Sequence, residues 1–269
     1  MLRRIMRELV VAIAQLDRVL EANVEKAIQY IVEAANKGAG VVCLPEYFST
    51  GFGYKDPAKM REELGKQAEP IPGPTIQRLQ QACKAGHVGV VGSIVEAVQG
   101  KFYNTAFAIS PNGELTNTYR KVHLFQVESQ IVQRGSGWGA FEMGFGKAGI
   151  MLCYDAIFPE AARALALAGA QVIFHPAAWM DPFLPQWRIA TNARALENQA
   201  WVISVNRVGK DELFTYFGRS GVVDPYGNEV LECGDKEGLV VLKIDLDKVK
   251  GFRSFLNFLG DRRPGAYTL

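Results

Sequence analysis

Three side chains that follow predicted strands are of the types needed for acyl-transfer chemistry. Glu46 ends the apolar run VVCLPE, Lys121 comes shortly after a predicted hairpin, and Cys153 ends the apolar run GIMLC. Pro159 then marks the start of a predicted helix, so the thiol lies at a turn between a strand and a helix. Functional groups of α/β proteins gather outside the carboxyl ends of strands, which makes these three side chains candidates for one site.

These residue types supply the parts of a cysteine-dependent hydrolysis. A thiol is mostly protonated at neutral pH and needs a base, which a carboxylate such as Glu46 can provide. An ammonium such as that of Lys121 favours the thiolate and stabilises the negative charge of a tetrahedral intermediate. The protonated carboxyl can then return its proton to the leaving amine before it activates water. Acyl transfer from an amide or a nitrile to Cys153 therefore needs neither a cofactor nor a metal.

Each of these side chains also has a purely structural interpretation. Glu46 could cap the turn 47–53, and Lys121 could be solvated within a locally basic stretch. For a lone cysteine in an apolar strand, an inert buried thiol is the commoner role. Cys153 differs because its strand stops there and a helix starts nearby, which brings backbone N–H groups close to the thiol.

The composition is that of a soluble globular protein. The chain has 269 residues, 48% of them hydrophobic and 22% charged, and a formal net charge of +2. Its basic residues are spread out, which argues against nucleic-acid binding, and its apolar stretches are too short for a membrane span or a secretory signal. Four cysteines and three histidines are scattered, so neither a zinc site nor a disulfide framework is predicted. A reducing cytoplasm is the expected location.

Short apolar runs alternate with helical patterns, which predicts a layered α/β architecture. Hairpin signals at 111–113 and 224–228 predict antiparallel pairs as well, so the sheet should be mixed. No linker or repeat interrupts this order, and we predict a single domain over residues 1–269. The predicted strands are 9–15, 41–44, 88–95, 102–109, 114–119, 147–152, 171–174, 201–206, 219–223, 229–231 and 238–245, and the predicted helices are 21–37, 75–84, 159–168 and 186–199.

The last residues, 253–269, are apolar and aromatic but show no clear period. We predict an irregular C-terminal arm there. A tail of this kind more often packs on another surface than extends into solvent, which favours a contact within a homo-oligomer.

Three motifs around the candidate residues resemble those of the nitrilase superfamily of carbon–nitrogen hydrolases. They are LPEYFSTGF around Glu46, YRKVHLFQVE around Lys121 and CYDAIFPEAAR around Cys153, in the family's order and approximate spacing. Further similarity runs through HPAAW (175–179), residues 194–209 and GRSGVVDPYGNEV (218–230). Each motif alone is weak, but together they extend the resemblance to nearly the whole chain.

The resemblance implies roles by position. It implies Glu46 as general base, Lys121 as oxyanion stabiliser and Cys153 as nucleophile. Glu128 matches a second glutamate that helps to orient the substrate and the lysine, and its alternative role is that of a solvated loop carboxylate. The backbone N–H of Tyr154 would be a second oxyanion donor. The implied fold is a four-layer α-β-β-α sandwich, assembled as a homodimer or a larger homo-oligomer.

Other polar residues in these motifs have structural interpretations. The spacing of Asp155 and Arg163 predicts that they meet across the turn and the first helix, where they would hold the turn. His123 and His175 are interpreted as hydrogen-bonded supporting groups, because a histidine base is not needed when Glu46 and Lys121 are present.

The expected substrate is a small amide. Tyr-Asp follows Cys153, as in many amidases of the superfamily, whereas its nitrilases usually carry Trp-Glu there. Tyr47, Phe125 and Trp179 are expected at the edge of the pocket, where aromatic walls suit a small and mostly apolar acyl group. Arg188 could pair with a carboxylate at the far end of the acyl chain. On that ground an ω-amidase acting on a dicarboxylic monoamide is the specific expectation.

Several alternatives stay open. A nitrilase or an N-carbamoyl-amino-acid hydrolase would share every catalytic residue and differ in the pocket. A non-catalytic member, with the fold retained as a binding or scaffolding module, is the alternative from another class. A cysteine protease of the Cys–His type is disfavoured, because neither His123 nor His175 has an obvious orienting partner.

Overall fold

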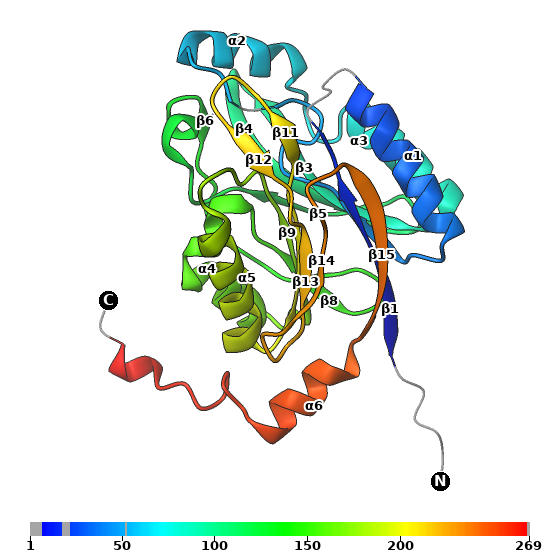
Figure 1. The fold of residues 1–269 in the computed structure, drawn as a ribbon, viewed down its shortest axis with the longest axis vertical. Helices are drawn as coiled ribbons and strands as arrows, with labels where there is room; N and C mark the ends of the chain where they lie inside the picture. Colours follow the sequence, from blue (N-terminus) through cyan, green and yellow to red (C-terminus); the bar gives the residue numbers. More distant parts are fainter. Residues whose placement is uncertain (1–6, 18–21, 52, 268–269) are drawn as a thin grey trace.

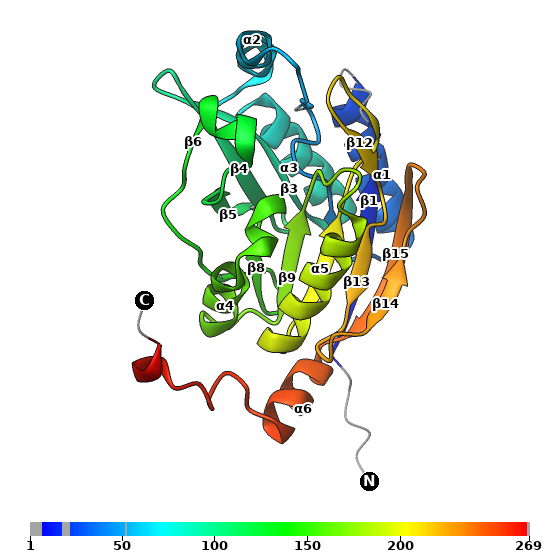
Figure 2. The ribbon, with the colours of Figure 1, turned by 60° about the vertical axis from the view of Figure 1, so that its left-hand side comes forward.

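The computed structural model describes residues 7–17, 22–51 and 53–267. Two β-sheets lie face to face, and helices cover their outer faces (Figures 1 and 2). Both sheets carry apolar side chains on their two faces, so each must be covered on both sides. The result is four layers in the order α-β-β-α, which confirms the predicted sandwich with mixed sheets.

The first sheet combines the N-terminal strands with one strand from near the C-terminus. The strands β1, β2 and β3 are parallel to one another, and antiparallel strands flank them on both sides. In spatial order the strands are β15 (Gly238–Asp245), β1 (Glu8–Gln15), β2 (Val41–Cys43), β3 (Gly89–Val98), β4 (Lys101–Ile109) and β5 (Leu115–Arg120), with β6 (Val132–Gln133) paired to β4.

The second sheet is built from the middle of the chain and has the same mixed character. Its spatial order is β14 (Glu229–Glu232), β13 (Gly221–Val223), β10 (Trp201–Val205), β9 (Val172–Pro176), β8 (Lys147–Ile150) and β7 (Phe141–Glu142). The strands β8, β9 and β10 are parallel, and the outer strands are antiparallel to their neighbours. In both sheets the carboxyl ends of the parallel strands lie on the same side of the sandwich. The loops that follow these strands meet there.

Two pairs of helices form the outer layers. The helices α1 (Asn23–Asn36) and α3 (Pro74–Gly86) cover the first sheet, while α4 (Pro159–Leu167) and α5 (Leu184–Asn198) cover the second. In α1 the buried Ala27, Ile31 and Ala34 recur at helical spacing and pack on the sheet. Between the sheets, side chains such as Ile13 and Phe174 form one continuous apolar cluster.

Most predicted elements are confirmed to within a few residues, although Glu21, the first residue of one predicted helix, lies outside the described residues. The sequence analysis did not predict the helix α2 (Pro57–Gln67) or the hairpin formed by β11 (Val208–Lys210) and β12 (Thr215–Phe217). Residues 208–217 mix charged and aromatic side chains without alternation, and α2 buries only Met60 and Leu64, so neither segment carries a strong periodic signal.

The predicted C-terminal arm begins later than expected. The helix α6 (Asp247–Phe255) extends into it and buries Val249 and Phe252, and the described residues after α6 contain only a short 3-10 turn at Pro264–Ala266. A contact of this arm with another subunit stays a prediction. Among the described residues, no helix combines the length and the apolar character that crossing a membrane requires.

Candidate active site

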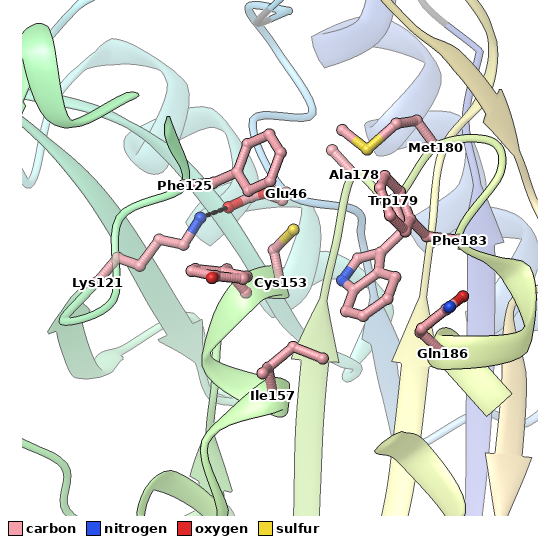
Figure 3. A pocket seen from close by; sticks show the side chains of 11 residues that line it. Glu46, Lys121, Phe125, Cys153, Ile157, Ala178, Trp179, Met180, Phe183 and Gln186 are labelled. Carbon is pink, nitrogen blue, oxygen red and sulfur yellow. Dashed lines mark hydrogen bonds and ion pairs between the residues drawn. The ribbon is translucent and has the colours of Figure 1, made fainter. Parts of the chain in front are cut away.

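A cavity of about 240 Å³ lies at the edge of the sandwich where loops of both sheets meet (Figure 3). Glu46, Lys121 and Cys153 all line it, so the structure brings the three candidate residues together. The side chains that line it are Glu46, Lys121, Phe125, Cys153, Tyr154, Ile157, Ala178, Trp179, Met180, Phe183 and Gln186.

Glu46 is held in the cavity by the turn that follows β2. The backbone N–H of Glu46 donates to the carbonyl oxygen of Ala177 at the end of the second sheet, 3.3 Å away. Tyr47 then adopts a left-handed backbone with φ of 49°, and its N–H donates to Ser93 Oγ at 3.0 Å. These bonds turn the chain sharply and leave the carboxylate of Glu46 buried, with 3% of the residue exposed.

Lys121 lies between two carboxylates. Its Nζ is 2.8 Å from Glu46 Oε1 and 2.8 Å from Glu128 Oε2, and all three side chains are buried. The backbone of Lys121 is fixed by an N–H bond to the carbonyl of Asn104 at 2.9 Å, just beyond β5. Figure 3 shows the ammonium and the Cys153 thiol on either side of the Glu46 carboxylate.

Glu128 closes this cluster from the 3-10 helix η2 (Gln126–Gln130). Its carboxylate accepts bonds from the Phe125 N–H at 2.9 Å and the Tyr47 hydroxyl at 2.8 Å. Asn104 Nδ2 donates to both Glu46 and Glu128, at 2.8 Å each. The alternative role of Glu128 as a solvated loop acid is therefore wrong, because the side chain is wholly buried and fully engaged.

The charges in this cluster shift one another's protonation. Burial raises the pKa of Glu46; the ammonium of Lys121 opposes this in part, and the charge of Glu128 adds to it. Burial alone would lower the pKa of Lys121, but the two carboxylates outweigh it and hold that pKa well above its ordinary value. The arrangement is therefore a permanent ammonium beside a carboxylate that accepts a proton more readily than usual.

Cys153 opens the 3-10 helix η3 (Cys153–Ile157) with a left-handed backbone, φ of 43°. For a residue with a side chain this conformation costs about 1–3 kcal/mol and requires support from its surroundings. The thiol lines the cavity beside the Glu46 carboxylate, whose charge acts on it. Burial raises the pKa of the thiol well above its ordinary value; the charge of Glu46 adds to this and that of Lys121 opposes it. At rest the sulfur is therefore protonated, with a carboxylate base beside it in the cavity.

His175 supports the strained backbone from behind. Its Nε2 lies 3.0 Å from the carbonyl oxygen of Cys153, which can only accept, so Nε2 carries the proton. Its Nδ1 then accepts from Ser204 Oγ at 3.0 Å. Burial lowers the pKa of His175 to about 4, so the ring is neutral. This confirms its interpretation as a hydrogen-bonded supporting group.

The predicted contact between Asp155 and Arg163 is wrong. The carboxylate of Asp155 instead faces Tyr119, whose hydroxyl donates at 2.6 Å, and both the N–H and the Nδ1 of His123, at 3.1 and 2.9 Å. It also accepts the Leu152 N–H at 2.9 Å. The 3-10 turn directs Asp155 toward the first sheet, so the residue links the strand end before Lys121 to the turn at Cys153.

The predicted pocket residues divide into three groups. Phe125 and Trp179 line the cavity as expected. Tyr47 lies behind it, with its hydroxyl on Glu128. Arg188 is not at the cavity: its side chain is 47% exposed and forms an ion pair with Glu232. Neighbouring helical residues are rotated by about 100°, so Arg188 turns away from the interior because the preceding residue faces it.

Tyr154 lines the cavity, and its role as an oxyanion donor stays a prediction. The first hydrogen bond of the turn η3 is donated by the Asp155 N–H to Leu152, so the turn itself makes no use of the Tyr154 N–H. The ring lines the cavity and packs edge-on against Phe125.

Sequence reasoning missed the mouth of the cavity and one polar residue at its base. Ile157, Phe183 and Gln186 are exposed and form the mouth, and Asn104 bridges the two glutamates. A single amide in the apolar strand β4 is a signal for Asn104, because a buried amide must find partners. The residues of the mouth come from two separate segments, the turn η3 and the start of α5. No group of three or more side chains suited to a metal is found within the described part of the chain.

Comparisons with known proteins identify relatives of this chain. Residues 10–254 match the carbon-nitrogen hydrolase family. The chain is similar to an omega-amidase from Xenopus laevis, with 34% identity over 92% of this chain and 91% of the relative. It is also similar to a nitrilase from Pyrococcus abyssi, with 37% identity over 90% of this chain and 89% of the relative.

The fold is likewise shared with a solved structure. A carbon-nitrogen hydrolase from Helicobacter pylori superposes with a TM-score of 0.88 at 23% identity, covering 96% of both chains. Sequence similarity, fold and the family match lead to one assignment. The chain belongs to the carbon–nitrogen hydrolase family, within the nitrilase superfamily.

Proposed function

We propose that the protein hydrolyses a small uncharged carboxylic amide to an acid and ammonia through an acyl-enzyme on Cys153. One observation carries the proposal: a protonated thiol lies at an apolar cavity beside the Glu46 carboxylate, which accepts a hydrogen bond from the Lys121 ammonium. A thiol, a base and a fixed positive charge are the parts that acyl transfer requires.

In the first half-reaction Glu46 takes the proton of the Cys153 thiol as the sulfur attacks the amide carbon. The C=O π electrons move onto oxygen, and the Lys121 ammonium and the Tyr154 N–H stabilise that oxyanion. When the carbonyl re-forms, the C–N bond breaks. The leaving nitrogen takes the proton from Glu46 and departs as ammonia, which leaves a thioester on Cys153.

In the second half-reaction water replaces the amine. Glu46 takes a proton from water while the oxygen attacks the thioester carbon. The intermediate collapses with cleavage of the C–S bond, and the proton on Glu46 returns to the sulfur. Overall, amide and water give carboxylic acid and ammonia, and the resting thiol is restored. Glu128 holds Lys121 in place through both steps.

The lining of the cavity supports an uncharged acyl group. Phe125, Ile157 and Met180 are apolar, and Lys121, which is bonded to two carboxylates, is the one basic side chain among the described residues that line the cavity. A dicarboxylic monoamide is a second candidate, because the chain is similar to an omega-amidase. Because Arg188 forms an ion pair with Glu232, the free carboxylate of such a substrate would need another cation.

The test is ammonia release from a matched panel at neutral pH. Butanamide, butanenitrile, succinamate and an N-carbamoyl amino acid are compared for the unmodified protein, Cys153→Ala and Glu46→Gln. We expect butanamide to be hydrolysed, Cys153→Ala to abolish release, and Glu46→Gln to lower kcat by roughly 10²- to 10⁴-fold. Cys233→Ala, a buried thiol that does not line the cavity, is the matched control and should retain activity.

Other outcomes decide between the alternatives. Release from butanenitrile with none from butanamide would replace the proposal by a nitrilase, and release from the N-carbamoyl substrate alone by a carbamoyl hydrolase. A folded protein that acts on no member of the panel, and whose Cys153 resists iodoacetamide, would favour the non-catalytic binding module.

A further inference from the structure

Trp179 places an unused hydrogen-bond donor in the cavity wall. The residue is 7% exposed, and its indole Nε1 is buried without a hydrogen-bond partner among the described residues. Its backbone is fixed on both sides, because the N–H donates to Asn206 Oδ1 at 2.7 Å and the carbonyl accepts from Asn206 Nδ2 at 3.1 Å. The main chain of Trp179 is therefore held in place by the end of the second sheet.

Two of the other three tryptophans use their indole N–H as a donor, and the third, Trp138, also has a buried Nε1 without a partner among the described residues but does not line the cavity. Trp187 packs edge-on against Trp179 and donates its Nε1–H to the Arg219 carbonyl at 3.0 Å. Trp201 donates in the same way to the Asp245 carbonyl at 3.0 Å. Buried donors without partners are rare in folded proteins, and one that faces a ligand cavity is a point of recognition.

The orientation of the ring places this donor where an acyl chain would pass. In Figure 3 the indole nitrogen lies on the edge of the ring that faces Cys153 across the cavity, while Gln186 lies beyond it at the mouth. A substrate held with its carbonyl carbon at Cys153 and its chain toward the mouth would therefore run past Trp179 Nε1.

We propose that Trp179 is a specificity-determining residue that selects amides whose acyl chain carries a neutral oxygen acceptor, such as a hydroxy, alkoxy or oxo group. This inference rests on the proposed amidase function and deepens it. The indole N–H donates to that oxygen. An acyl chain with a methylene group in its place would fill the same volume but leave the buried donor unpaired, and sites of this kind discriminate strongly between such analogues.

A neutral oxygen fits better than a carboxylate. The indole N–H carries no formal charge, and the wall beside it is apolar apart from the neutral amide of Gln186. A buried carboxylate needs a cation, and Lys121 is already bonded to Glu46 and Glu128.

Two pairs of isosteres test the inference. Methoxyacetamide is compared with butanamide, and 3-methoxypropanamide with pentanamide; within each pair an ether oxygen replaces a methylene, at successive positions along the chain. For the unmodified protein we expect kcat/KM to favour the ether by about tenfold or more in at least one pair. In Trp179→Phe, which keeps an aromatic ring but removes the donor, that ratio should fall to near one.

Trp187→Phe is the matched control, because its indole already donates to a backbone carbonyl and does not line the cavity. It should keep the ratio of the unmodified protein. Ratios near one for both pairs in the unmodified protein would overturn the inference while leaving the amidase proposal intact. A ratio that survives in Trp179→Phe would also overturn it. If no amide in either pair is hydrolysed, the proposed function fails and the inference fails with it.

Discussion

The two sheets contribute different kinds of side chain to one cavity. The first sheet and its loops supply a charged cluster, in which Lys121 is bonded to Glu46 and Glu128. The second sheet supplies neutral groups: the Cys153 thiol and the Trp179 indole. The charged and the neutral side chains of the cavity therefore come from different halves of the sandwich. The proposed proton transfer, from Cys153 to Glu46, crosses from the neutral half to the charged half.

The two halves are also stabilised in different ways. Asn104 and the Tyr47 hydroxyl hold the charged cluster through interlocking hydrogen bonds. The neutral half instead holds one strained residue, Cys153, whose carbonyl is bound by His175. Disturbing the first half should therefore cost stability directly, whereas disturbing the second should act mainly on the position of the thiol.

The largest expected effect comes from removing the positive charge of the first half. Lys121→Met would leave Glu46 and Glu128 buried without their cation, and we expect the free energy of unfolding to fall by about 3–5 kcal/mol, with loss of activity. Urea unfolding measures the first effect and ammonia release the second. The control is Lys59→Met, which removes a solvent-exposed ion pair with Glu212 and should leave the free energy of unfolding almost unchanged. Equal losses in the two variants would contradict a direct contribution of the buried charged cluster to stability.

A smaller loss of stability is expected from His175, in the neutral half, when the pH is lowered. Burial lowers the pKa of His175 from its ordinary value of 6.5 to about 4, so between these values the unfolded chain binds a proton that the folded protein does not. The free energy of unfolding should therefore decrease as pH falls through this window, by at most about 1.4 kcal/mol for each pH unit.

His175→Gln tests this assignment. The variant keeps an N–H that can reach the Cys153 carbonyl but removes the titrating ring, so its stability should depend less steeply on pH between 6.5 and 4. Thermal unfolding at a series of pH values measures the difference. Parallel curves for the two proteins would show that other groups account for the loss.

The smallest effect is expected at Arg188, which lies outside both halves and does not line the cavity. Arg188→Ala removes an exposed ion pair with Glu232, so we expect a loss below about 1 kcal/mol and no change in the ratio of kcat/KM for succinamate to that for butanamide. A selective loss of succinamate hydrolysis would show that Arg188 reaches the substrate after all.

The sequence was sufficient to predict what local patterns encode. The apolar runs that end at Glu46 and Cys153 define strand ends, and strand ends of one architecture meet at one edge, so the meeting of these residues was predictable. Features that depend on the rotation of a helix or on long-range packing could not be predicted from the sequence. The direction of Arg188 follows from how α5 packs on the sheet, and the distant partners of Asp155 come from β5 and the loop after it, more than thirty positions earlier. The β11–β12 hairpin, whose Phe217 packs with Cys153, has no local signature of that contact.

The enclosed cluster has a consequence for how charge is conserved during turnover. The proposed transfer moves one proton from the Cys153 sulfur to Glu46, so one unit of negative charge passes from the Glu46 carboxylate to the sulfur. The net charge within the cavity stays the same. No ion has to enter or leave to balance the step. The catalytic end of the cavity can therefore stay shielded from solvent ions while the reaction proceeds, and only the neutral amide, water and products need to pass its mouth.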